Sequence, residues 1–180
     1  MPASLLRAAD CTLLIVDMQA RLLPAIHDGQ AVLDAAVKLA RAARLLEVPV
    51  VATEHAADRL GPTVPQLAGE LRAVFPKRHF SAAREPGFEA WLPAARRTVL
   101  VAGWEAHVCV LQTILDLRVR GWHVAMVSDA SGSRWPSDHH AATRRVRAAG
   151  ADIVSTEMAI FEWLEHCDHP RFGEVLRLVK

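Results

Sequence analysis

Three residues of this 180-residue chain have side chains that could together perform nucleophilic chemistry: Asp17, Lys77 and Cys109. Cys109 comes shortly after the apolar run 98–102 and Gly103, where a helical pattern begins. Backbone N–H groups at a helix start lack partners and carry a partial positive potential, which stabilises a thiolate. The position therefore favours a nucleophilic cysteine, although free cysteines are also common as small core residues.

The other two side chains could activate this cysteine. Asp17 directly follows the apolar run 11–16, and Lys77 stands between Phe75 and Phe80, where partial burial would require a carboxylate partner. A carboxylate can accept the thiol proton, while an ammonium lowers the pKa of the thiol. We therefore expect an acidic thiol that is alkylated readily near neutral pH. The alternatives are that Asp17 only caps a turn and that Lys77 is a solvated surface residue.

Apolar runs and helical patterns alternate along the chain, which predicts a three-layer α/β/α fold around a six-stranded, mostly parallel sheet. Right-handed crossovers would place helices on both faces of this sheet. Strands are expected at 11–16, 48–52, 74–78, 98–102, 122–127 and 151–154, and the main helices at 30–46, 87–95, 109–120, 138–149, 156–165 and 170–179. Because ligand groups gather at the carboxyl ends of parallel strands, the three side chains should share one edge.

Composition limits the class of protein. The chain is 52% hydrophobic and 23% charged with a formal net charge of +1, which indicates one globular domain over residues 1–180. Scattered arginines give no reason to expect nucleic acid, and the sequence has neither a membrane-length apolar run nor an export signal. Three cysteines without a CxxC pair predict a reducing, cytoplasmic setting rather than a disulfide framework.

Three motifs resemble the isochorismatase-like cysteine hydrolases, a family that includes nicotinamidase and N-carbamoylsarcosine amidase. They are LLIVDMQ at 13–19, FPKRHFSA at 75–82 and VLVAGWEAHVCVLQT at 99–113, in the family's order. The resemblance extends over nearly the whole chain and implies strand order 3-2-1-4-5-6.

The resemblance also assigns roles to individual residues. It implies Asp17 as general base, Lys77 as its cationic partner and Cys109 as the nucleophile that forms an acyl-enzyme. It further implies a non-proline cis peptide at Trp104–Glu105, which helps to turn N–H groups, including that of Cys109, into an oxyanion hole.

The segment after the second expected strand departs from the nicotinamidases. Those enzymes carry Asp-x-His and a further histidine that bind a metal, whereas this chain has Thr53, Glu54 and His55, followed by Asp58, with no second histidine nearby. We therefore expect no metal, no other cofactor and no nicotinamide substrate. Glu54, His55 and Trp104 are candidates for the substrate pocket.

These observations predict a hydrolase that cleaves the C–N bond of a small amide, carbamoyl or similar molecule. The presence of Cys109 favours this reaction over isochorismatase-type vinyl ether hydrolysis, which does not use the cysteine. A non-catalytic assembly protein of the same fold and a thiol redox sensor are the alternatives from other classes. We expect a homo-oligomer that binds neither nucleic acid nor membranes.

Overall fold

Six parallel strands form a single sheet in a computed structural model of the chain, which describes residues 5–180. The strands are β1 (Cys11–Val16), β2 (Val50–His55), β3 (Ala73–Lys77), β4 (Thr98–Trp104), β5 (His123–Gly132) and β6 (Asp152–Val154). Their order across the sheet is β3-β2-β1-β4-β5-β6, which confirms the predicted topology. Residues 1–4, which belong to the domain expected over 1–180, lie outside the described residues.

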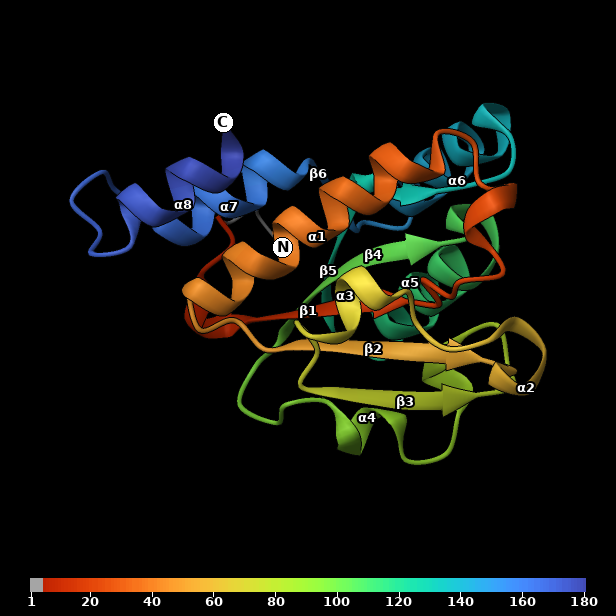
Figure 1. Ribbon diagram of the computed structural model, residues 1–180. Helices are drawn as coiled ribbons and strands as arrows, with labels where there is room; N and C mark the ends of the chain where they lie inside the picture. Colours follow the sequence, from red (N-terminus) through yellow and green to blue (C-terminus); the bar gives the residue numbers. More distant parts are fainter. Residues whose placement is uncertain (1–4) are drawn as a thin grey trace.

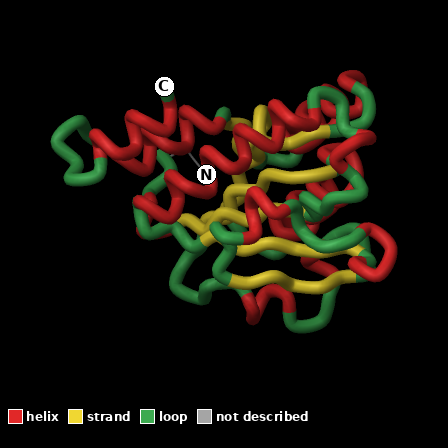
Figure 2. The backbone as a smooth tube through the Cα atoms, in the orientation of Figure 1, coloured by secondary structure: helices red, strands yellow, loops and turns green. Residues whose placement is uncertain are grey.

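Helices pack on both faces of the sheet and complete the three layers (Figures 1 and 2). The α-helices are α1 (Gly29–Leu45), α2 (Ala57–Leu60), α3 (Pro65–Ala68), α4 (Phe88–Trp91), α5 (Leu111–Val119), α6 (Pro136–Ala148), α7 (Thr156–Leu164) and α8 (Phe172–Val179). Four short turns complete the secondary structure: η1 (Ala8–Asp10), η2 (Leu23–Ala25), η3 (Ala82–Arg84) and the π-helical turn η4 (Ala106–Val110). No helix in the described part of the chain is both long and apolar enough to cross a bilayer.

The strand β1 separates two hydrophobic clusters because its successive side chains point to opposite faces. Leu13 and Ile15 pack with side chains of α1, α7 and α8, whereas Leu14 and Val16 pack with those of α4, α5 and α6. All six residues of β1 are buried. A continuous apolar run is typical of such a strand, and it explains why sequence located β1 correctly.

Three strands extend further than their apolar runs. β2 continues through Thr53, Glu54 and His55, β4 continues to Trp104, and β5 continues to Gly132. The end of β2 pairs with β3, so that His55 lies in register with Lys77. Hydrogen bonding to a neighbouring strand does not require apolar side chains, which is why hydrophobicity alone placed these ends too early.

The carboxyl ends of the strands point to the same side of the molecule, as the arrows of β2, β3 and β4 show (Figure 1). Asp17 follows β1, Lys77 ends β3, and Cys109 lies in η4 between β4 and α5. The expected convergence at one sheet edge is therefore present.

A close backbone approach at Gly103 fixes how β4 meets β1. Gly103 has φ of +133°, and a Cβ added there would lie 2.0 Å from the carbonyl oxygen of Val16. Gly103→Ala should therefore lower the free energy of unfolding by about 3 kcal/mol or more.

Urea denaturation would measure this change against Gly69→Ala as the matched control. Gly69 has φ of −72° and no neighbouring atom within 4 Å of an added Cβ. We expect the control to change stability by no more than about 1 kcal/mol. Equal stability of the two variants would contradict the assigned packing.

Candidate active site

The carboxylate of Asp17 and the ammonium of Lys77 form a buried ion pair, with 2.6 Å between Oδ2 and Nζ. Asp17 is fully buried and Lys77 is only 3% exposed. β2 lies between the strands that carry them, so the lysine reaches across the end of β2. The structure therefore brings together two residues that are 60 positions apart in sequence.

Thr53 orients the carboxylate of this pair. Its Oγ1 donates a hydrogen bond of 2.7 Å to Oδ1 of Asp17, while Lys77 occupies the side of Oδ2. The backbone carbonyl of Thr53 also accepts from the Asp17 N–H at 3.1 Å. Sequence reasoning missed this role. The sequence signal for this role was a threonine at the end of an apolar run, two residues before His55. Side chains with this spacing on a strand point to the same face of the sheet.

The ammonium of Lys77 has further partners in the segment that follows β3. Nζ donates to the carbonyl oxygens of His79 at 3.1 Å and Phe80 at 3.0 Å. The ammonium thus has two carbonyl acceptors in addition to its ion pair with Asp17. These protein groups partly replace the water that the buried charge lacks.

Cys109 lies beside the ion pair and is 7% exposed. Burial, together with the negative charge of Asp17, raises the pKa of its thiol to about 12, while Lys77 acts in the opposite direction. The expected acidic thiol is therefore wrong for the resting protein. Sequence reasoning counted the ammonium and the helix start, but not the desolvation of a nearly buried thiol.

The backbone before Cys109 turns sharply between β4 and η4. The Trp104–Glu105 peptide bond is cis, at the position implied by the family resemblance. The Glu105 carbonyl accepts from the N–H groups of Val108 at 3.0 Å and Val110 at 3.2 Å. Cys109 therefore belongs to the first turn of the helical segment that continues into α5.

Side chains from the segment after β5 hold this turn in place. Arg134 Nε lies 2.7 Å from Oε2 of Glu105, and Ser133 Oγ lies 3.0 Å from Nδ1 of His107. Ser133 is buried, and its carbonyl accepts from the His27 N–H at 2.9 Å. The turn that carries Cys109 is thus connected to the loops after β1 and β5.

Two of the three pocket candidates do not reach the cleft. Glu54 lies between Thr53 and His55 on β2, so its side chain points to the opposite face, where Oε1 accepts from the Thr63 N–H at 2.7 Å. Trp104 is fully buried in the cluster beneath α1. Glu54 and Trp104 are therefore corrected to structural positions, and only His55 faces the side of Lys77.

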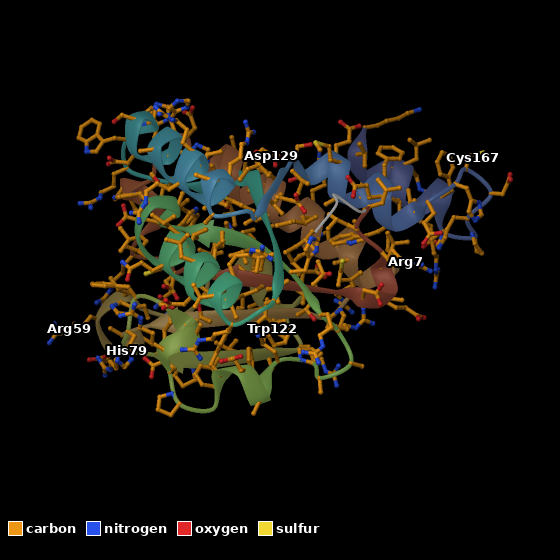
Figure 3. All side chains as sticks on the ribbon, turned by 180° about the vertical axis from the view of Figure 1, so that it is seen from behind. Arg7, Arg59, His79, Trp122, Asp129 and Cys167 are labelled. Atoms are coloured by element: carbon orange, nitrogen blue, oxygen red, sulfur yellow. The ribbon has the colours of Figure 1, made fainter. Side chains whose placement is uncertain are left out.

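The other two cysteines lie away from the ion pair. Cys11 is buried in β1, and Cys167 is exposed on the loop between α7 and α8. Cys167 lies at the opposite end of the molecule from His79, which follows β3 (Figure 3). Among residues 5–180, no three His, Cys, Asp or Glu side chains are arranged to hold a metal ion.

Comparisons with known proteins agree on one family. The family model described as the isochorismatase domain matches residues 11–158. Bovine isochorismatase domain-containing protein 2 is 37% identical over 168 residues, which cover 93% of this chain and 82% of the relative.

Two solved structures are also similar over almost the full chain. The MAR1 ribonuclease from Caenorhabditis elegans is 35% identical with a TM-score of 0.92, covering 98% of this chain and 92% of that one. YcaC from Pseudomonas aeruginosa, solved with hexane-2,5-diol and covalent acrylamide, is 27% identical with a TM-score of 0.91, covering 99% and 93%.

The electrostatics of the cleft predict opposite effects of its two charges on the thiol. Asp17→Asn removes the charge that opposes thiolate formation and leaves the Lys77 ammonium, so the pKa of the Cys109 thiol should fall by at least about one unit. Lys77→Met should raise that pKa. The pH dependence of iodoacetamide labelling, followed by peptide mass spectrometry, measures the pKa of the thiol in each variant.

The structures of the variants should be compared by circular dichroism, because each variant leaves one buried charge without its partner. Labelling of Cys167, which is exposed, serves as an internal control in every sample. A higher pKa of Cys109 in a folded Asp17→Asn variant would contradict the assigned arrangement of charges.

Proposed function

The chain belongs to the isochorismatase family, and we propose that it is a cysteine hydrolase that cleaves the C–N bond of a small amide or carbamoyl compound. The observation that carries this proposal is the buried Lys77–Asp17 ion pair beside the thiol of Cys109. A nucleophile, a base and a cation within one cleft are the groups that acyl transfer through a thioester requires.

The raised pKa of Cys109 assigns the first step to Asp17. A thiol that is protonated at neutral pH needs a base at the moment of attack, and the Asp17 carboxylate is the adjacent acceptor. The sulfur attacks the carbonyl carbon while its proton passes to Asp17. Lys77 then faces a neutral carboxylic acid and a negative tetrahedral centre, which its ammonium stabilises.

The backbone of η4 would stabilise the intermediate. N–H groups of the first turn, including that of Cys109, can donate to the oxyanion, and one such donor is worth about 10²–10³ in rate. Collapse of the intermediate returns the proton from Asp17 to the leaving nitrogen, breaks the C–N bond and leaves a thioester on Cys109. Water, deprotonated by Asp17, then hydrolyses the thioester and regenerates the thiol.

The closure of the cleft favours a small substrate. The three reacting side chains are between 0% and 7% exposed, so a polymer could not bring an internal phosphodiester to them without a large opening. RNA cleavage, suggested by the name of the Caenorhabditis elegans relative, is therefore less compatible with this geometry. Incubation with a labelled RNA is nevertheless a necessary control for any preparation.

The homo-oligomer expected from sequence remains part of this proposal. Large apolar side chains are exposed on the surface, including Leu5, Met158 and Phe161, which line one groove beside α7. Covering such residues is a common reason for association. Light scattering after size-exclusion chromatography would give the number of subunits.

The principal test is release of ammonia from a panel of small primary amides. Wild-type protein should release ammonia, and Cys109→Ala should lose at least ~10³-fold of the rate because it has no nucleophile. Hydroxylamine should intercept the thioester as a hydroxamate in the wild type only. Cys167→Ala, which changes an exposed cysteine far from the site, is the matched control.

Parallel assays with a vinyl ether and with an oxidant distinguish the alternatives. Full activity of Cys109→Ala towards a vinyl ether would support ether hydrolysis by Asp17 and Lys77. Reversible oxidation of Cys109 without turnover would support a redox sensor. Neither turnover nor oxidation in a folded protein would support the assembly role.

Thr53 offers a second test of the mechanism. Thr53→Val keeps the shape of the side chain but leaves Oδ1 of Asp17 without its hydrogen bond, so kcat should fall about 10-fold or more while KM changes little. Thr53→Ser retains the hydroxyl and should restore most of the rate. Equal kcat values for the valine and serine variants would show that the hydrogen bond does not position the base.

A further inference from the structure

His55 lies on the same face of the sheet as the catalytic cation. In the parallel pairing of β2 with β3, His55 is directly in register with Lys77, so their side chains project to the same side. Thr53, two residues earlier, contacts Asp17 from that side. The imidazole is therefore positioned beside the reacting groups.

The backbone of His55 is held rigidly, although its ring has an unused polar atom. Buried Gln19 accepts from the His55 N–H at 2.9 Å and donates to its carbonyl at 3.1 Å. Nδ1 of the ring is buried without a hydrogen-bond partner among the described residues. The His79 backbone lies beside the ring but forms no well-aligned bond to Nδ1. A buried nitrogen without a partner costs free energy that a bound molecule can recover.

An aromatic ring lies next to this nitrogen. The ring centroids of His55 and Phe80 are 5.3 Å apart with an interplanar angle of 30°. Phe80 is 51% exposed, which is unusual for a phenylalanine, and its carbonyl holds Lys77. The ring of Phe80 thus offers an exposed apolar surface next to His55.

The cations around the site already have acidic partners. Lys77 is paired with Asp17 and Arg78 with Asp58 at 3.0 Å, while Nδ1 of His79 lies 2.9 Å from Oε1 of Glu85. Burial and the neighbouring ammonium lower the pKa of His55, which keeps its imidazole neutral at pH 7. A charged ligand drawn into this cleft would lose its hydration without gaining a counter-ion.

We infer that His55 and Phe80 form the specificity surface of the site and select small, uncharged amides. His55 would hydrogen-bond to the amide through Nδ1, and Phe80 would contact an apolar substituent. This inference rests on the proposed function for the identity of the reacting group. It excludes carboxylate-bearing and ammonium-bearing substrates of the same size.

Covalent labelling of Cys109 tests this selectivity without requiring turnover. Acrylamide and acrylate have nearly the same shape, but only acrylate is charged. In both reactions the sulfur bonds to the terminal carbon of the double bond, and a proton is added to the neighbouring carbon. Rates measured by mass spectrometry on the full chain are divided by those of glutathione with the same reagent. Acrylamide should then be favoured by at least ~10-fold.

Variants of His55 identify the source of the preference. His55→Leu should slow labelling by acrylamide about 10-fold, whereas His55→Gln, which keeps a hydrogen-bonding side chain, should stay within about threefold of the wild type. His140→Leu, the same change at an exposed position on α6, is the matched control. Phe80→Ser should remove any preference for N-isopropylacrylamide over acrylamide.

The outcomes separate this inference from the proposed function. Equal normalised rates for acrylate and acrylamide, equal rates for His55→Leu and His55→Gln, or no labelling of Cys109 by either reagent would overturn the inference. Amide hydrolysis that does not depend on His55 would leave the hydrolase proposal intact and reject the specificity surface. Selective labelling without hydrolysis of any amide would support the specificity surface and reject the hydrolase proposal.

Discussion

Placing an ammonium and a carboxylate out of contact with water costs several kcal/mol for each ion, and the Lys77–Asp17 pair persists because protein groups replace that water. Thr53 supplies a hydroxyl to the carboxylate, and two carbonyls after β3 accept from the ammonium. Pairs of this kind contribute little to stability when compared with apolar residues of similar size. Their chemical use is therefore a stronger explanation for the arrangement than their effect on stability. The contacts that the ion pair needs also fix the positions of the ends of β1, β2 and β3.

The topology divides the cleft into two halves with different tasks. The half built on β1, β2 and β3 holds the base, its cation and His55. The half built on β4 and β5 holds the nucleophile, because Glu105 and His107 in the turn contact Arg134 and Ser133. The halves meet where β1 pairs with β4, at the close contact of Gly103 with Val16. Small errors in that pairing would separate the thiol from its base.

Sequence could predict the parts of this protein that depend on local pattern. Apolar runs located the strands, and three motifs gave the topology and the convergence of Asp17, Lys77 and Cys109. The rest depends on tertiary contacts. Strand register decides that His55 faces the cleft while Glu54 does not, and only packing shows the burial that raises the pKa of the thiol. Thr53 was missed because its partner, Asp17, follows a different strand.

Phe80 has two roles, since its ring contacts His55 and its backbone carbonyl accepts a hydrogen bond from the Lys77 ammonium. Attempts to widen the entrance by inserting or deleting residues between His79 and Ala82 would shift that carbonyl and disturb the lysine. Exchange of the side chain alone avoids this difficulty. Directed evolution towards bulkier substrates should therefore accumulate substitutions at this position and leave the loop length unchanged.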